Sequence, residues 1–210
     1  MKLAASYAPV ATYVAALHEE IELVAGLLPA GMAVSHLAWG GGTPTALSPD
    51  DLAAVMGRLR RHFHFVDDAE LSIESDPRTL TPEMAARIGA LSFTRASFGV
   101  QEFDPAVQRA INRIQPPEMV AEAVGNLRRA GVARINFDLI YGLPHQTEAT
   151  LLASIDTAAA MRPDRVALFG YAHVPWMAKK QRLIDEAALP GGAARARQAE
   201  MAAAALAGHG

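Results

Sequence analysis

Segments with helix-like and strand-like hydrophobic patterns alternate along the chain. Apolar residues that recur every three or four positions predict helices, and a short helical run opens at Asp104-Pro105 and ends near Ile114. The longer predicted helices cover residues 7–28, 48–63, 81–91, 116–131 and 147–161. Short apolar runs predict strands over residues 34–40, 69–75, 95–101, 134–142 and 165–173. From Met177 onward the Ala-rich sequence predicts further helix, with a break at LPGG.

Residues at the helix ends support several of these boundaries. Ser48 and Thr81 are each followed by proline, which suits the first position of a helix. A Ser or Thr side chain just before that position can accept a hydrogen bond from a free backbone N–H. Gly131 predicts the end of the helix before it, because glycine adopts the left-handed conformation at little cost.

The order of segments predicts an α/β fold of about five βα units. Residues at the strand ends recur roughly every 30 residues, the length of one βα crossover; they are Trp39, Glu74, Gln101, Asp138 and Tyr171. The strands read as apolar on both faces, as a buried parallel sheet requires. An open doubly wound sheet and a barrel or partial barrel both fit, and functional residues at every strand end favour the barrel. We expect one core domain over residues 1–210.

Composition narrows the class of protein. The chain has 210 residues, of which 51% are hydrophobic and 20% charged, with a net charge of −3. This balance argues against nucleic acid as a partner, because a binder of phosphates needs a basic surface. No apolar run of membrane-spanning length and no secretory signal is found, so we expect a cytoplasmic protein. The sequence contains no cysteine, which excludes disulfides and any thiolate metal site built from this chain alone.

Three consecutive glycines, Gly40 to Gly42, follow the first predicted strand and lead into Thr43-Pro44-Thr45. One glycine would indicate only a turn, whereas three leave a backbone that a ligand can approach closely, with N–H groups free to bind an anion. The loop is not a Walker loop, because no lysine follows, and it lacks the spacing of the dinucleotide fingerprint. The run therefore predicts a binding loop for a carboxylate or another anion.

Other candidate binding residues lie at or near strand ends. Glu74 either caps its loop or accepts hydrogen bonds from an ammonium or a ribose. Asp138 has apolar neighbours, and a buried charge requires a partner, which can be Arg113 or a cationic ligand. Gln101 offers a neutral amide. The remaining candidates, His145 and His173, fit loop packing at least as well as a functional role.

Five sequence blocks resemble, in order, those of the oxygen-independent coproporphyrinogen III oxidases, a family of radical S-adenosylmethionine enzymes of heme synthesis. The blocks are WGGGTPT, SIESDPR, FGVQEFDPAVQRAINRIQ, INFDLIYGLPHQT and YAHVPWMAKKQ. The heme chaperones of the same superfamily are the nearest alternative. Four features favour the oxidases, namely Thr45, Asp76, Glu102 and the Tyr171-Ala172-His173 block.

The resemblance implies a partial (β/α)6 barrel that binds two S-adenosylmethionine molecules. Gly41 and Glu74 would contact the first molecule. The second would be contacted by Gly42, Thr43, Gln101, Arg113, Asp138 and Ala172. We expect these residues to line one cavity, with Arg113 at its rim, and expect Glu74 and Asp138 to interact with ligand rather than with each other. The resemblance also implies that coproporphyrinogen III is the substrate and that an external donor supplies electrons. We expect the protein to be a monomer.

The chain departs from the family in one respect that affects chemistry. The family holds a four-iron four-sulfur cluster on a CxxxCxxC loop after its first strand, and neither that loop nor any cysteine is present here. We therefore expect a fragment that lacks the first strand and the C-terminal domain, without catalytic activity of its own. A module that binds S-adenosylmethionine or a porphyrin without catalysis is the alternative.

Overall fold

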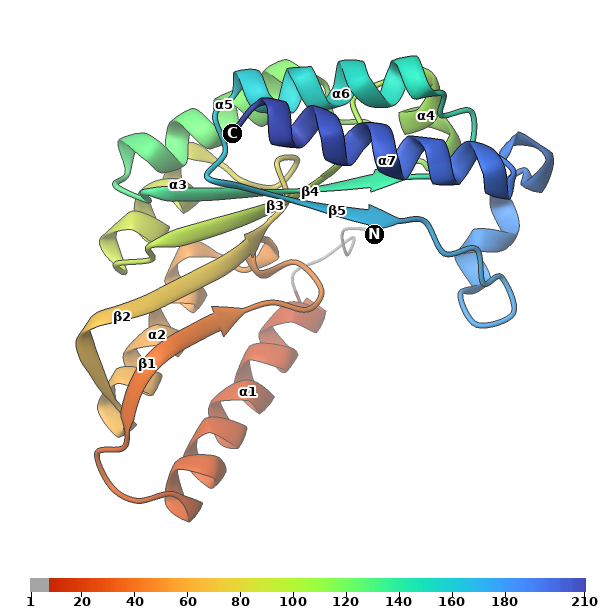
Figure 1. The fold of residues 1–210 in the computed structure, drawn as a ribbon. Helices are drawn as coiled ribbons and strands as arrows, with labels where there is room; N and C mark the ends of the chain where they lie inside the picture. Colours follow the sequence, from red (N-terminus) through yellow and green to blue (C-terminus); the bar gives the residue numbers. More distant parts are fainter. Residues whose placement is uncertain (1–7) are drawn as a thin grey trace. The chain divides into compact units, whose positions relative to one another are not determined.

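The computed structural model describes residues 8–210 and shows an α/β fold (Figure 1). The strands are β1 (Ala33–Trp39), β2 (His64–Ser75), β3 (Arg95–Gln101), β4 (Arg134–Tyr141) and β5 (Arg165–Gly170). The α-helices are α1 (Ala8–Leu27), α2 (Pro49–His62), α3 (Pro82–Ala90), α4 (Pro105–Ala110), α5 (Pro117–Arg129), α6 (Glu148–Ala160) and α7 (Gly192–Gly208). Short 3-10 turns cover Pro44–Ala46, Lys179–Leu183 and Glu186–Ala188.

The strand order distinguishes between the two architectures that the sequence left open. The five strands form one sheet in the order β1-β2-β3-β4-β5, and the pairs β1/β2 and β4/β5 are parallel. Each crossover therefore moves in the same direction along the sheet. A doubly wound sheet reverses its strand order at a switch point, whereas a barrel does not. The order agrees with the partial barrel and not with the doubly wound alternative.

The predicted helix caps are confirmed. The Ser48 side chain accepts a hydrogen bond from Asp51 N at 3.0 Å at the start of α2. The Thr81 side chain accepts one from Met84 N at 3.1 Å at the start of α3. Gly131, with a φ of +90°, follows the end of α5 as expected for a left-handed terminating residue.

Three boundaries predicted from sequence are wrong. Strand β2 begins at His64 rather than at residue 69, because its first residues pair with β1 before a bulge that falls between Val34 and His36 of β1. Helix α4 ends at Ala110 rather than near residue 114, since Asn112 has a positive φ of 51°. Strand β5 ends at Gly170 rather than at residue 173.

The prediction that all strands are apolar and buried on both faces is also wrong. The side chains of β1 and β5 are exposed or half-buried along their whole length. These are the two edge strands of the sheet, so each has a strand neighbour on one side only. In the central strand β3, buried and half-buried residues alternate, so only one of its faces is fully covered.

The described residues form two compact units, each with its own core. Unit 1 comprises the residues up to Ala96 together with 125–133, and unit 2 comprises 97–124 and 134–210. In unit 1 the rings of Trp39 and Phe93 lie 5.9 Å apart, and α1 packs beside α2. In unit 2 the buried rings of Phe98 and Phe137 meet edge to face at 6.2 Å, and α6 lies beside α7 (Figure 1). One core domain over residues 1–210 stays a prediction.

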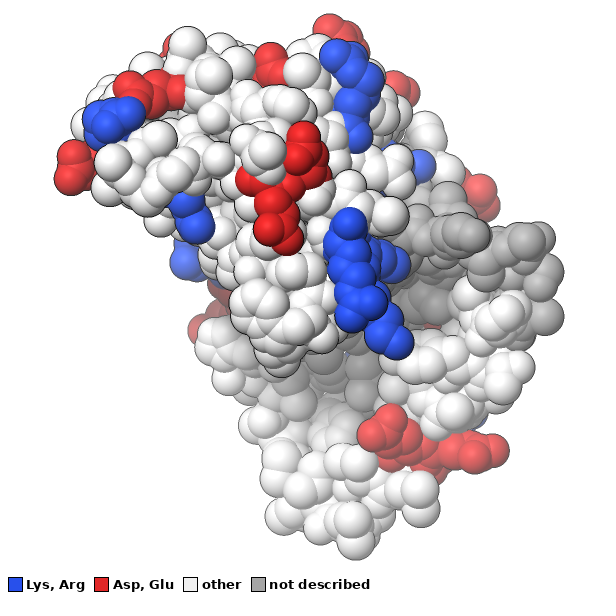
Figure 2. Space-filling view, turned by 90° about the vertical axis from the view of Figure 1, so that its right-hand side faces the viewer, with Lys and Arg blue, Asp and Glu red and all other residues white. Residues whose placement is uncertain are grey.

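The surface carries charges of both signs. On the face drawn in Figure 2, Lys and Arg side chains alternate with Asp and Glu among larger uncharged areas, in keeping with the small net charge of −3. Among residues 8–210, every helix is too short or too polar to cross a bilayer.

Candidate functional site

The glycine loop after β1 adopts backbone conformations that favour glycine. Gly41 and Gly42 have φ values of +74° and +44°, in the left-handed region that other residues rarely adopt. A Cβ at either position would meet no atom of the described residues within 4 Å, so the backbone there is open to a ligand. A Cβ at Gly40 would instead lie 2.8 Å from the Glu74 Oε1 atom. The structure thus brings the glycine loop and the Glu74 carboxylate together.

Two motifs that are distant in sequence interlock in unit 1. The buried Thr45 shares a 2.8 Å hydrogen bond between its Oγ1 atom and that of Thr79, and also accepts one from Asp76 N at 3.4 Å. Arg78 donates to both oxygens of the Asp76 carboxylate, at 2.9 and 2.6 Å. This hydrogen bonding with Asp76 raises the pKa of Arg78. These contacts fix the loop that follows the glycines against the end of β2, where Glu74 is exposed.

In unit 2, Gln101 and Arg113 lie against the same glycine. Arg113 donates through Nε and Nη2 to the Gly99 carbonyl, at 3.1 and 2.7 Å. A Cβ at Gly99 would lie 2.7 Å from Gln101 Nε2 and 3.3 Å from Arg113 Nη2. Gln101 ends β3 with a positive φ of 68°, an uncommon conformation that functional sites often contain.

Asp138 lies on the half-buried face of β4. Its neighbours Phe137 and Leu139 are buried on the opposite face. Asn136, two residues before Asp138, donates a 3.4 Å hydrogen bond from Nδ2 to Ser97 Oγ on β3. Because side chains alternate between faces along a strand, Asp138 shares its face of the sheet with Ser97, and so with the Gly99 and Gln101 positions of β3.

A buried network around Glu102 supports this strand end, and sequence reasoning missed that role. The Glu102 carboxylate accepts hydrogen bonds from Phe103 N, Asp104 N, Ser154 Oγ and Gln146 Nε2. Gln146 also donates to the Ile140 carbonyl at 2.9 Å. The network therefore joins the end of β3 to α6 and to the end of β4. Burial is the main cause of the raised pKa of Glu102.

A second network holds the turn that carries Arg113. Gln108 Nε2 donates to the carbonyls of Glu102 and Gln115, at 2.8 and 2.9 Å. Gln115 N donates to Gln108 Oε1 at 3.0 Å. Both glutamine side chains are almost fully buried. The sequence did not predict that these two glutamines are buried and hydrogen-bonded to each other, because they meet only after the chain reverses at Asn112.

Two of the remaining candidate residues, Ala172 and His173, lie in the segment after β5. The Ala172 carbonyl accepts a 2.9 Å hydrogen bond from Gln181 Nε2. The Tyr171 hydroxyl lies 3.2 Å from His173 Nδ1, and His173 Nε2 lies 3.0 Å from Glu186 Oε1. Burial raises the pKa of Tyr171. His145 is exposed, has a φ of +61° and takes part in a backbone turn rather than in these contacts.

Each unit therefore brings together part of the predicted site. Unit 1 places Gly40 beside Glu74 and ties their loops through Thr45. Unit 2 places Gln101 beside Arg113, on the face of the sheet that also carries Asp138. That all these residues line one cavity stays a prediction, as does the absence of a direct interaction between Glu74 and Asp138.

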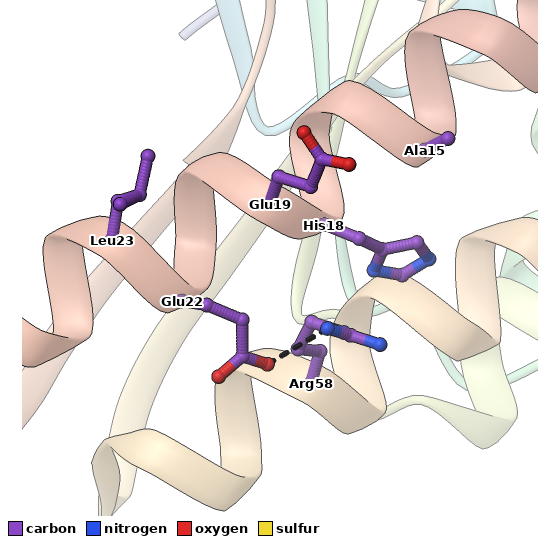
Figure 3. A pocket seen from close by; sticks show the side chains of 6 residues that line it. All are labelled: Ala15, His18, Glu19, Glu22, Leu23 and Arg58. Atoms are coloured by element: carbon purple, nitrogen blue, oxygen red, sulfur yellow. Dashed lines mark hydrogen bonds and ion pairs between the residues drawn. The ribbon is translucent and has the colours of Figure 1, made fainter.

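A pocket elsewhere in unit 1 contains none of the predicted residues. It lies along α1 and α2 (Figure 3) and is lined by Ala15, His18, Glu19, Glu22, Leu23 and Arg58. Glu22 Oε1 accepts from Arg58 Nη1 at 2.8 Å, and Glu22 Oε2 lies 2.9 Å from His62 Nε2. Chiefly through the hydrogen bond with His62, the pKa of Glu22 is lowered. These contacts tie α1 to α2, and we assign them to the stability of unit 1.

The residues present fit S-adenosylmethionine but not an iron–sulfur cluster. The methionine end of the cofactor carries an ammonium and a carboxylate, which suit the Glu74 carboxylate and the backbone N–H groups of the glycine loop beside it. A cluster is normally held by thiolates, and the 210 residues contain no cysteine. Among residues 8–210, no group of three His, Asp or Glu side chains is placed to hold a metal ion.

Comparison with known proteins identifies relatives over most of the chain. The model of the radical SAM superfamily matches residues 11–158. The chain is 55% identical over 181 residues to the uncharacterized protein y4hJ of Sinorhizobium fredii, covering 86% of this chain and 70% of that protein. It is 50% identical over 190 residues to the oxygen-independent coproporphyrinogen III oxidase of Bradyrhizobium diazoefficiens, covering 90% of this chain and 42% of that enzyme.

A solved structure supports the fold. The coproporphyrinogen III oxidase of Escherichia coli matches with a TM-score of 0.94 and 38% identity, over 98% of this chain and 47% of that chain. The resemblance predicted from the sequence blocks is therefore confirmed, and so is the partial barrel of the radical S-adenosylmethionine type. The chain spans less than half the length of each of these two oxidases.

Proposed function

Because the chain belongs to the radical SAM superfamily, we propose that it forms the S-adenosylmethionine-binding part of an oxygen-independent coproporphyrinogen III oxidase. One observation carries the proposal: the glycine loop has left-handed, open backbone conformations directly beside the Glu74 carboxylate. The 50% identity to a coproporphyrinogen oxidase gives the proposal its reaction. The substrate is coproporphyrinogen III, the protein is a cytoplasmic monomer, and the electrons come from an external donor.

In this proposal two molecules of S-adenosylmethionine bind at the carboxyl ends of the strands. Gly41 and Glu74 hold the first, with the carboxylate accepting hydrogen bonds from its ammonium. The second is held by Gly42, Thr43, Gln101, Arg113, Asp138 and Ala172. Arg113 suits the carboxylate of that molecule and Asp138 its ammonium or ribose hydroxyls, while Gln101 contributes a neutral amide.

The chain's own contribution to the reaction is to bind S-adenosylmethionine and to orient it. When bound, S-adenosylmethionine would supply the radical chemistry that acts on the propionate side chains, and the residues of this chain would hold and orient it. The buried Glu102 and Gln108 networks keep the ends of β3 and β4 in fixed positions, so that the contacts to the cofactor are made without rearrangement. These 210 residues offer no thiolate for a cluster.

Calorimetric titration with S-adenosylmethionine tests the binding proposal. We expect Glu74→Gln and Asp138→Asn each to weaken binding about tenfold, the order of one charge-assisted hydrogen bond. Asp50→Asn serves as the matched control, because its side chain is 91% exposed and pairs only with Arg87 among the described residues. Unchanged affinity and stoichiometry in Asp138→Asn would show that its assigned role is wrong.

The second candidate function is a module that binds S-adenosylmethionine or a porphyrin without catalysis, as a heme chaperone does. The absence of cysteine favours it if these 210 residues are the whole protein. Anaerobic incubation of the chain, extended at its N-terminus by a CxxxCxxC segment of the oxidase family, with iron, sulfide, a reductant and S-adenosylmethionine separates the two candidates. Release of 5′-deoxyadenosine supports the enzyme, and binding of the cofactor without its cleavage supports the module.

A further inference from the structure

Arg195 occupies an unusual place at the carboxyl ends of β4 and β5. It is the fourth residue of α7, in the first turn, where a positive side chain is opposed by the helix dipole. Its guanidinium is half-buried and donates from Nη2 to the Tyr171 carbonyl at 2.6 Å. Among residues 8–210 no carboxylate pairs with it. A guanidinium has five N–H donors, so most of the donors of Arg195 are available to a ligand.

Two glycines make room for this guanidinium. A Cβ at Gly142, which has a φ of +82°, would lie 2.8 Å from Arg195 Nε. A Cβ at Gly170 would lie 3.5 Å from Arg195 Nη2 and 2.9 Å from the hydroxyl oxygen of Tyr141. Gly142 follows β4 and Gly170 ends β5, so both strand ends are free of side chains at the points that these polar groups approach.

The Tyr141 hydroxyl is a second polar group near the Arg195 guanidinium. The side chain is half-buried, and within residues 8–210 its hydroxyl has no hydrogen-bond partner. Arg195 and Tyr141 both approach Gly170, one from α7 and the other from β4. Gly191, the N-cap residue of α7, offers no side-chain cap, and the first turn of the helix has no acidic residue, so the N-terminal field of the helix adds to the positive charge.

From this arrangement we propose that Arg195 and Tyr141 form a carboxylate-binding site at the carboxyl ends of β4 and β5. A planar guanidinium matches a carboxylate in shape, and a phenol hydroxyl adds a neutral donor. The inference rests on the proposed function for the source of the carboxylate, since coproporphyrinogen III carries four propionate groups. The methionine carboxylate of S-adenosylmethionine is the other source with the same chemistry.

Titration of the 210-residue chain with coproporphyrin III, its tetramethyl ester and S-adenosylmethionine tests the site. We expect Arg195→Gln to weaken coproporphyrin binding about tenfold or more, and to leave binding of the ester and of S-adenosylmethionine unchanged. Tyr141→Phe should weaken coproporphyrin binding a few-fold without a loss of stability, because the hydroxyl holds no bond within the described fold. If the Tyr141 hydroxyl were only structural, Tyr141→Phe would leave the affinity for coproporphyrin unchanged. Arg195→Lys should restore part of the loss.

Arg197→Gln is the matched control, because Arg197 lies two residues further along α7, is exposed and pairs with Glu148 at 2.7 Å. A tenfold loss for S-adenosylmethionine in place of coproporphyrin would support the site and assign it to the cofactor. Wild-type affinity of Arg195→Gln and Tyr141→Phe for both ligands would overturn the site while leaving the proposed function intact. A wild-type chain that binds neither ligand would contradict both.

Discussion

Replacing Glu102 by glutamine tests whether the buried network at the end of β3 fixes unit 2. The substitution keeps the size of the side chain, but one acceptor oxygen becomes an NH2 group that faces donors. Phe103 N retains a 3.1 Å bond to Ser154 Oγ, and Gln146 Nε2 retains its 2.9 Å bond to Ile140 O. Phe103 N, Asp104 N and Ser154 Oγ all donate to Oε1, so the amide keeps its oxygen there, and the new NH2 group replaces Oε2 and faces the Nε2 donor of Gln146. Since a hydrogen bond to a charged group contributes roughly 1.5–3 kcal/mol, we expect a loss of about 2 kcal/mol at neutral pH.

The pH dependence of this loss follows from the direction of the pKa shift. Burial raises the pKa of Glu102 above 4.5, so the native state holds a proton at pH values where the unfolded chain has lost it. The ionised, buried carboxylate therefore costs stability above the raised pKa, and that cost disappears as the pH falls toward 4.5. Glutamine does not titrate. The wild-type chain should accordingly gain stability relative to Glu102→Gln as the pH is lowered from 8 to 5.

Urea denaturation followed by circular dichroism at several pH values between 5 and 8 measures both effects. Glu122→Gln is the control, because Glu122 is exposed on α5 in the same unit. The reasoning is refuted if Glu102→Gln unfolds at the same urea concentration as wild type at pH 7. It is equally refuted if the difference between the two proteins shrinks as the pH is lowered.

Three further predictions concern unit 1 and the cluster. Gly41→Ala should cost about 1 kcal/mol of stability through its left-handed φ and also weaken S-adenosylmethionine binding, which denaturation and calorimetry measure separately. His62→Gln should raise the pKa of Glu22 toward 4.5, observed by carbon-13 NMR; an unchanged Glu22 pKa would mean that the His62 contact does not form in solution. Anaerobic reconstitution with iron and sulfide should leave no cluster absorbance near 400 nm after desalting, and a retained cluster would reveal ligands other than thiolates.

Local sequence signals predicted those parts of the fold that depend on neighbouring residues. The proline-linked caps at Ser48 and Thr81 and the stop at Gly131 are short-range features, and the structure confirms all three. The start of β2 was missed because Asp67 and Asp68 interrupt the apolar pattern, although the chain continues as a strand through them. Exposure of the edge strands depends on the order of strands in the sheet, which no single segment encodes.

The sequence predicted the motifs of the candidate site but not the buried hydrogen-bond networks that hold them. The glycine loop and Glu74 were recognisable because their residue types are unusual at strand ends, and they do lie together. Glu102 was noted only for its place in a motif, since its partners Gln146 and Ser154 lie more than 40 residues away. Arg195 lies in an Ala-rich helix with a weak pattern, and only the folded chain brings it to Gly142.

An experimental structure of the 210-residue chain crystallised with S-adenosylmethionine tests the central claim most directly. The account predicts the cofactor at the glycine loop, with backbone N–H groups of Gly41 to Thr43 and the Glu74 carboxylate within hydrogen-bond distance of its methionine end. It also predicts Asp138 in contact with bound ligand rather than with Glu74. A cofactor bound elsewhere, or Glu74 and Asp138 at opposite ends of the sheet, would contradict it.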